Sequence, residues 1–236
     1  IIVVIFLHFF NETNNNLKSK VNMILDQLFS VKDKVVLITG GSRGIGEMIA
    51  EGFVANGARV YISSRKEQEL KDTADRLKNS YNGHCEGIQC DISNIDGIKK
   101  LFQEYNKKES SLDILVNNAG AVWTEPLEDF SEQGWDKVMD LNVKSIFFMI
   151  QKFLPLLKIN ASNSCKTKVI NIGSIDGINT PYYETYSYSV AKAAVHKLTK
   201  VIAAKLIKDN IVCNAIAPGP FPSKMLGSAV EHDYSI

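Results

Sequence analysis

The chain has 236 residues, of which 45% are hydrophobic and 22% are charged. This length and composition fit one sizeable globular domain and exclude collagenous, low-complexity and disordered proteins. The 27 Lys and Arg residues nearly balance the 26 Asp and Glu residues, so the net charge of +1 provides no field that attracts a polyanion, and we expect no nucleic-acid partner.

The first 28 residues do not resemble the start of a domain. The apolar run Ile1–Phe10 is shorter than the about 20 residues that a membrane-spanning helix needs, and it lacks the basic region and the cleavage site of a signal peptide. The first methionine is Met23. We therefore interpret residues 1–28 as an extension of doubtful origin, with a membrane or organelle address as the alternative, and residues 29–236 as a single domain.

From Lys34 onward, short runs rich in Val and Ile alternate with longer amphipathic stretches. Parallel strands need such crossover segments between them, so the alternation predicts an α/β fold with a doubly wound parallel sheet and helices on both faces. The predicted strands are Val35–Thr39, Arg59–Ser63, Cys85–Gln89, Ile114–Asn117, Lys168–Ile172 and Ile211–Ile216. The predicted helices are Gly44–Asn56, Lys66–Asn79, Ile95–Lys108, Ser131–Leu157 and Tyr188–Lys208.

A glycine-rich loop joins the first predicted strand to the first predicted helix. In an open α/β sheet, ligands bind beyond the carboxyl ends of the strands, so this loop is a candidate phosphate site. Gly40 permits a tight turn, Gly44 permits close approach of a pyrophosphate, and Gly46 permits close packing of the helix. The candidate cofactor-binding residues of the loop are Gly40, Ser42, Arg43, Gly44, Ile45 and Gly46.

A second candidate site lies near the last predicted helix, where Tyr188 precedes Lys192 by four residues. This spacing places both side chains on one face of a helix. Lowering a phenol pKa from about 10 to about 7 requires roughly 4 kcal/mol, which one positive charge at ~4 Å supplies at an effective dielectric of ~20. The pair therefore predicts a tyrosine that can act as an acid near neutral pH.

These motifs resemble the short-chain dehydrogenase/reductase family, whose glycine motif has the TGxxxGxG spacing found here. The resemblance runs from about Phe29 to Met225 and is greatest for the 3-oxoacyl-[acyl-carrier-protein] reductases of the rhamnolipid-synthesis type. It implies a Rossmann-type fold. The family's last helix and seventh strand have no counterpart before Ile236, so we expect the domain to lack them.

The resemblance also assigns roles around the cofactor. It implies that the turn Asn118-Ala119-Gly120 closes the adenine side, that Asp91 caps the adenine ring next to Ile92, and that Pro218-Gly219 lies against the nicotinamide. Ser223 stands where the family often has Thr, and its hydroxyl is expected to contact the cofactor.

In the catalytic site, the resemblance implies that Tyr188 protonates the carbonyl oxygen, that Lys192 lowers the pKa of Tyr188 and binds the ribose, and that Ser174 polarises the carbonyl. Asn142 corresponds to the family Asn that holds a water in the proton relay. The nearby tyrosines Tyr182, Tyr183 and Tyr186 lack a Lys four residues later.

The end of the second predicted strand bears on the choice of cofactor. NAD-dependent proteins place an acid there, whereas this chain has Ser64 followed by Arg65 and no carboxylate that would repel a 2′-phosphate. Arg65 and Arg43 offer planar donors for that phosphate. We therefore predict NADP(H) as the cofactor.

Two functions remain open from the sequence. The first is an NADPH-dependent reductase acting on a small-molecule carbonyl or an acyl thioester, such as a 3-oxoacyl thioester of fatty acid metabolism, and working as a homodimer or homotetramer. The second is a catalytically silent dinucleotide-binding sensor or scaffold. The four cysteines and four histidines have neither CxxC, HExxH nor paired Cys/His spacing, so we expect reduced thiols, no metal site and a cytoplasmic location.

Overall fold

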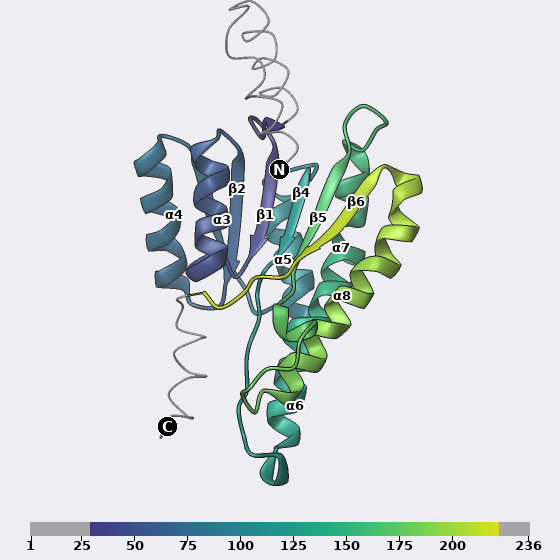
Figure 1. The fold of residues 1–236 in the computed structure, drawn as a ribbon. Coiled ribbons are helices and arrows are strands. Elements are labelled where there is room, and N and C mark those ends of the chain that lie inside the picture. The colour runs from purple at the N-terminus through teal and green to yellow at the C-terminus, as the bar shows by residue number, and fades with distance from the viewer. Residues whose placement is uncertain (1–28, 222–236) are drawn as a thin grey trace, which may run out of the picture. The chain divides into compact units, whose positions relative to one another are not determined.

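The structure is a computed structural model that describes residues 29–221 (Figure 1). The chain divides after Lys32 into two compact units, and the description that follows concerns the unit that begins at Asp33. Ser223, which was predicted to contact the cofactor, lies outside the described residues, as does the whole of the predicted N-terminal extension, residues 1–28.

The described residues contain a six-stranded parallel sheet in the order β3-β2-β1-β4-β5-β6. Chain order therefore reverses between β1 and β4, which pair through Leu37 and Leu115. This order is that of the dinucleotide-binding Rossmann fold, and it confirms the predicted fold class. The strands are β1 Val35–Thr39, β2 Arg59–Ser64, β3 His84–Gln89, β4 Ile114–Asn117, β5 Thr167–Ile172 and β6 Ile211–Ile216.

The α-helices connect successive strands, and their ends lie within two residues of the predicted boundaries. The stretch predicted as one helix from Ser131 is interrupted by a π-helical turn at Asp140–Lys144, and the last helix begins at Tyr186, two residues before the predicted start. The helices are α3 Gly44–Ala55, α4 Glu67–Tyr81, α5 Ile95–Asn106, α6 Glu132–Met139, α7 Ser145–Ile159 and α8 Tyr186–Leu206.

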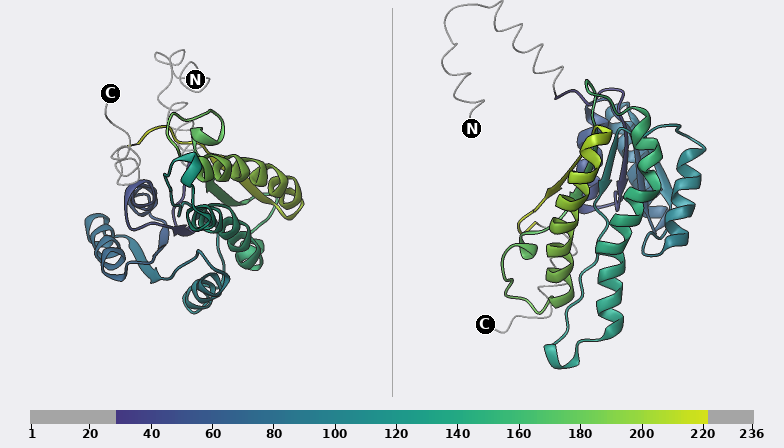
Figure 2. Two further views of the ribbon diagram at one scale, coloured as in Figure 1. Left: turned by 90° about the horizontal axis from the view of Figure 1, so that it is seen from below. Right: turned by 90° about the vertical axis from the view of Figure 1, so that its right-hand side faces the viewer.

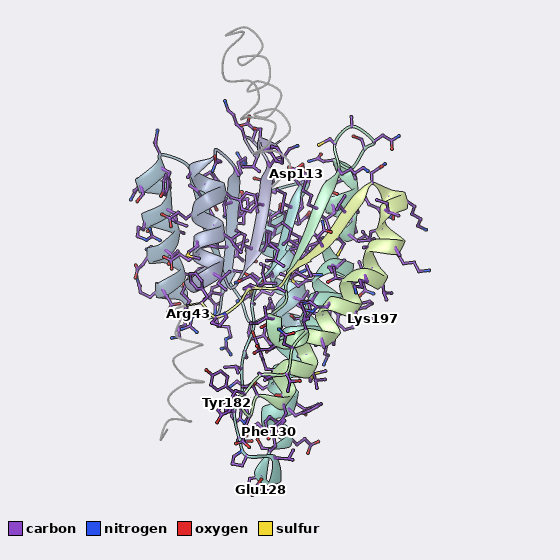
Figure 3. All side chains as sticks on the ribbon, in the orientation of Figure 1. Arg43, Asp113, Glu128, Phe130, Tyr182 and Lys197 are labelled. Atoms are coloured by element: carbon purple, nitrogen blue, oxygen red, sulfur yellow. The ribbon has the colours of Figure 1, made fainter. Side chains whose placement is uncertain are left out.

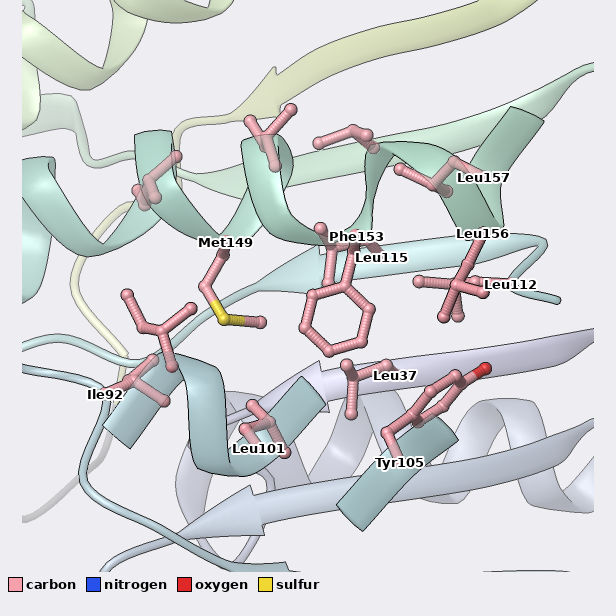
Figure 4. Packing of buried hydrophobic residues seen from close by; sticks show 14 of the residues in the cluster. Leu37, Ile92, Leu101, Tyr105, Leu112, Leu115, Met149, Phe153, Leu156 and Leu157 are labelled. Atoms are coloured by element: carbon pink, nitrogen blue, oxygen red, sulfur yellow. The ribbon is translucent and has the colours of Figure 1, made fainter. Parts of the chain in front are cut away.

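The two faces of the sheet have separate cores because side chains alternate along each strand. Leu37 of β1 and Leu115 of β4 belong to a cluster that also contains Met149 and Phe153 of α7 (Figure 4). The edge of the Tyr105 ring on α5 packs against Phe153, with the ring centroids 5.4 Å apart. Helix α8 contributes to the same cluster. Helices α3 and α4 pack against each other on the other face of the sheet, opposite α5, α7 and α8 (Figure 2). Right-handed crossovers between the parallel strands require this arrangement.

The two ends of the sheet differ in character. At the amino ends of the strands the buried Asp113 carboxylate accepts a hydrogen bond of 2.9 Å from the backbone N–H of Val35, a structural role. Arg43 lies at the other end, as Figure 3 shows. There the loops after β1, β4 and β5 meet, and α6 with the first turns of α8 extends past the strands (Figure 1).

Within residues 29–221, no helix combines the length and the apolar character needed to cross a membrane. The four cysteines, all of them in this part of the chain, are free thiols. No group of three or more potential metal-ligating side chains is found among the described residues.

Candidate active site

One cavity of about 630 Å³ runs along the carboxyl ends of the strands. It brings together nearly all the predicted site residues, which come from the ends of the six strands and from α8. Of those within the described part of the chain, only Asn142 does not line it. The predicted residues that line the cavity are Gly40, Ser42, Arg43, Gly44, Ile45, Gly46, Ser64, Arg65, Asp91, Ile92, Asn118, Ala119, Gly120, Ser174, Tyr188, Lys192, Pro218 and Gly219.

The glycine loop has the geometry of a phosphate cradle at the N-terminus of α3. Gly40 and Gly44 have φ values of +66° and +57°, in the left-handed region that favours glycine. A Cβ on Gly46 would lie 2.2 Å from the carbonyl oxygen of Gly40, so a larger residue would push the loop away. A Cβ on Gly44 would meet no atom within 4 Å. Open space therefore lies where the free N–H groups of the helix can bind an anion.

The Asn118-Ala119-Gly120 turn is attached to this loop through four hydrogen bonds. The Asn118 side-chain amide donates to the carbonyl oxygens of Thr39 and Gly40 at 3.0 and 3.1 Å. The Thr39 hydroxyl oxygen accepts from the backbone N–H groups of Asn118 and Ala119 at 3.0 and 3.1 Å. The two loops thus form one wall of the cavity, which confines a ligand to the point where strand order reverses.

Lys192 lies in the deepest part of the cavity, one turn after Tyr188 on α8. Only 4% of it is exposed, and its Nζ donates a hydrogen bond of 2.7 Å to the Ile172 carbonyl oxygen at the end of β5. The same Nζ lies 5.4 Å from the centroid of the Tyr188 ring. Burial lowers the pKa of Lys192 to about 8, although the carboxylate of Asp176 opposes the shift.

The pKa of Tyr188 differs in direction from the value argued from the sequence. Burial raises it, the Asp176 carboxylate raises it further, and the neighbouring Ser174 hydroxyl lowers it in part. The sequence argument considered the ammonium charge alone and left out the desolvation of both groups. In the cavity without cofactor the Tyr188 phenol therefore holds its proton at neutral pH.

Ser174 is held in an orientation that suits a hydrogen-bond donor. It follows β5 and is 8% exposed, and its Oγ accepts a hydrogen bond of 3.2 Å from the backbone N–H of Asp176. A hydroxyl that accepts in this way keeps its own O–H for a second partner, and the Tyr188 hydroxyl, whose pKa the hydrogen bond with Ser174 lowers, lies within its reach.

Asn142 lies behind the cavity wall in the π-helical turn. Its side-chain amide donates to the carbonyl oxygen of Ala121, and its Oδ1 accepts from the N–H of the same residue, both at 2.8 Å. A Cβ on Gly120 would lie 2.9 Å from Asn142 Oδ1 and 3.8 Å from Lys192 Nζ. π-Helical turns often occur at functional sites. Here the turn directs Asn142 so that its side chain positions the Gly120-Ala121 segment beside Lys192.

The other tyrosines near the active site differ in their surroundings. Tyr182 is 74% exposed, and Tyr186 donates to Glu184 and packs against Phe130 with the ring centroids 5.7 Å apart. Tyr183 lines the cavity, but Tyr188 is the tyrosine that lies against Lys192.

Two carboxylates in the cavity were missed in the sequence analysis. Glu69 of α4 lines the cavity together with Arg65, so a carboxylate is present there although none stands at the end of β2. It accepts a hydrogen bond of 3.0 Å from Ser42 and lies 4.0 Å from Arg43 Nε and 3.8 Å from Lys66 Nζ. The i, i+3 spacing of Lys66 and Glu69 at a helix start was the available signal.

The second missed carboxylate is Asp176, two residues after Ser174. Its place in the loop after a parallel strand could have marked it, because ligands bind beyond the carboxyl ends of such strands.

Comparison with known proteins agrees with this geometry. The family model described as short chain dehydrogenase matches residues 34–233. The chain belongs to this family. It is therefore an oxidoreductase, as the resemblance of the motifs predicted.

Among the relatives, the Rhamnolipids biosynthesis 3-oxoacyl-[acyl-carrier-protein] reductase of Pseudomonas aeruginosa is 47% identical over 197 residues, which cover 84% of this chain and 76% of that protein. A solved active-site complex of RhlG with NADP from the same organism matches with a TM-score of 0.82 and 45% identity, covering 87% of this chain and 79% of that one. L-Sorbose reductase from Gluconobacter frateurii, solved with NADPH and L-sorbose, matches with a TM-score of 0.77 and 30% identity, covering 82% and 72%.

Proposed function

We propose that the chain is an NADPH-dependent reductase that transfers hydride to a carbonyl group, with Tyr188 as the proton donor. One observation carries the proposal: a single cavity is lined both by the glycine loop and by Ser174, Tyr188 and Lys192. A protein that only binds a dinucleotide has no need of a protonated phenol beside a buried lysine.

The side chains suit the steps of such a reaction. The nicotinamide supplies the hydride when the cofactor is bound. When a substrate is bound, the O–H of Ser174 donates a hydrogen bond to its carbonyl oxygen and polarises the C=O bond. The buried Tyr188 phenol gives its proton to that oxygen, which becomes the alcohol hydroxyl. Lys192, fixed on the Ile172 carbonyl, presents its ammonium to the ribose.

The surroundings of Arg65 favour NADPH over NADH as the cofactor. It is exposed at the cavity rim, and its guanidinium forms no ion pair with any carboxylate in the described part of the chain. A guanidinium in this state can bind a phosphate in bidentate fashion. The solved RhlG complex contains NADP, which supports the same choice.

The relative from Pseudomonas aeruginosa suggests the substrate. We propose a 3-oxoacyl thioester or a related ketone, because that reductase is 47% identical and apolar side chains, Val122, Leu141 and Ile175, line the cavity. We also propose that the protein forms a homodimer or homotetramer. The aromatic side chains of Trp135 on α6 and Phe147 on α7 are exposed, and an interface between subunits would cover such side chains.

The test of the proposed function is steady-state NADPH oxidation with acetoacetyl thioesters and simple ketones as substrates. We expect oxidation that depends on the ketone and yields one alcohol for each NADPH consumed. Tight NADPH binding without turnover of any of them would instead favour the silent sensor or scaffold.

Glu69→Gln should bind NADPH several-fold more tightly than the wild type. The carboxylate of Glu69 engages Ser42, Arg43 and Lys66, so it competes for the donors that a 2′-phosphate would use. NADH, which lacks that phosphate, should bind nearly unchanged. Fluorescence titration with both cofactors measures the difference, with Glu67→Gln as control because Glu67 is exposed on the same helix outside the cavity. Unchanged or weaker NADPH binding would contradict the prediction.

Reduction should weaken as the pH rises through about 8. Burial lowers the pKa of Lys192 to that value, so the ammonium that binds the ribose loses its proton above it, whereas Tyr188, whose pKa is raised, stays protonated. The pH profile of kcat/KM for NADPH reports the titrating groups of the free enzyme, and it should show a falling alkaline limb near pH 8. In Lys192→Arg the charge persists, so the limb should be absent even if activity is lower. The same limb in that variant would assign it to another group.

A further inference from the structure

The active-site cavity contains a carboxylate that the reaction described above does not use. Asp176 lines the cavity together with Ser174, Tyr188 and Lys192, and it is half-buried. Its backbone N–H donates to Ser174 Oγ, but among residues 29–221 its carboxylate has neither a hydrogen-bond donor nor an ion-pair partner. A partly desolvated charge without a partner is unfavourable unless a ligand donates a hydrogen bond to it.

The segment that carries Asp176 is held firmly in place. It is a 3-10 turn, Ile175–Gly177, in which the N–H of Ile175 donates to the Pro218 carbonyl at 3.1 Å and the N–H of Gly177 donates to the Ser174 carbonyl at 3.1 Å. A Cβ on Gly177 would lie 2.5 Å from the backbone carbonyl carbon of Lys192, so the turn packs directly on α8. The position of Asp176 is therefore set relative to the catalytic residues.

The pKa shifts of Asp176 and Tyr188 agree with the position of Asp176 close to the catalytic residues. Burial raises the pKa of Asp176, and the Lys192 ammonium opposes that shift. The carboxylate in turn raises the pKa of Tyr188. Lys192 nevertheless forms no ion pair with Asp176, and its Nζ donates to the Ile172 carbonyl instead. The carboxylate oxygens of Asp176 can therefore accept a hydrogen bond from a ligand that lies beside Tyr188.

We propose that Asp176 determines substrate specificity by accepting a hydrogen bond from a donor on the ketone substrate. The proposal rests on the reductase function above and narrows its substrate class. The substrate carries an O–H or N–H group that reaches Asp176 while the reacting carbonyl lies beside Tyr188, and free 3-oxo acids are disfavoured because their carboxylate meets a like charge. Two sources of the donor fit: a hydroxyl beside the ketone, or the amide N–H of a pantetheine-type thioester arm.

Two matched pairs of substrates distinguish these sources. 1-Hydroxy-2-butanone differs from 3-pentanone by a hydroxyl in place of a methyl group. The acetoacetyl thioester of N-acetylcysteamine differs from its 2-acetoxyethyl analogue by N–H in place of oxygen. We expect the wild type to prefer the donor-bearing member of at least one pair by about tenfold or more in kcat/KM, which is what a hydrogen bond to a charged acceptor contributes. The preferred pair identifies the source.

The variants separate specificity from stability. In Asp176→Ala the preference should fall to about one while NADPH affinity stays close to the wild-type value, and acetoacetate should become a better substrate. Asp176→Asn, which is isosteric and keeps an acceptor oxygen, should retain part of the preference, and it decides the question if the alanine variant does not fold. Asp129→Ala, an exposed residue outside the cavity, should retain all of it.

Two outcomes would overturn the proposal in different ways. Equal preference ratios in the wild type, Asp176→Ala and Asp176→Asn would overturn the role of Asp176 and leave the reductase function intact. A wild type that binds NADPH but reduces none of the four ketones would overturn the proposed function and this inference together.

Discussion

Tyr188→Phe should abolish carbonyl reduction and leave NADPH affinity within a few fold of the wild type. The substitution removes the phenol proton that the carbonyl oxygen needs, while the ring and its packing near Lys192 are kept. Steady-state NADPH oxidation with a ketone measures the first effect, and fluorescence titration measures the second.

Tyr186→Phe is the matched control for this prediction. Tyr186 is only two residues away, but its hydroxyl bonds Glu184 outside the cavity, so its loss should be nearly silent. Reduction by Tyr188→Phe at more than a few percent of the wild-type rate would remove Tyr188 from the role of acid.

Arg65→Ala should weaken NADPH binding by roughly 1.5 to 3 kcal/mol, or about tenfold to a hundredfold, and leave NADH binding nearly unchanged. The reason is that only NADPH carries the 2′-phosphate, and Arg65 is exposed at the cavity rim with no carboxylate partner among the described residues. Isothermal titration with both cofactors measures the difference.

Arg76→Ala controls for the loss of a positive charge. Arg76 lies on α4, the helix that follows Arg65, but pairs with Glu47 outside the cavity, so this variant should bind both cofactors as the wild type does. Equal losses for NADPH and NADH in Arg65→Ala would show that Arg65 acts on folding and not on the phosphate.

The strands could be predicted closely because most of them, with β3 as the exception, are short Val- and Ile-rich runs bounded by polar or glycine residues. Three of them, β1, β4 and β6, have the predicted boundaries, and the other three begin or end within one residue of the prediction. A buried parallel strand depends on little beyond its own apolar sequence, so its position can be predicted from the local residues alone.

The helices show where local sequence is insufficient. No feature of the apolar pattern marks the π turn at Asp140–Lys144, whose Asn142 is hydrogen-bonded to Ala121, a residue of the loop after β4. The start of α8 was predicted two residues late, since Thr185 provides no side-chain cap that a sequence reading could detect.

Motif order and spacing predicted residues of the cavity lining in the loop after every strand of the sheet. The electrostatics could not be predicted in the same way, because they depend on burial and on groups that arrive from other elements. Glu69 reaches Ser42 from α4, and the pKa of Tyr188 follows its burial and the charge of Asp176. Such contacts follow from how the elements pack, which spacing along the chain does not show.

The most direct test of the account is hydride transfer itself. NADPH labelled with deuterium at either face of the transferable position is incubated with the protein and acetoacetyl-N-acetylcysteamine or 1-hydroxy-2-butanone, and the alcohol is examined by mass spectrometry. The account predicts that deuterium from one of the two labelled forms appears on the carbinol carbon in the wild type, and that no labelled alcohol forms in Tyr188→Phe. NADPH that binds the wild type but transfers no deuterium to either ketone would contradict it.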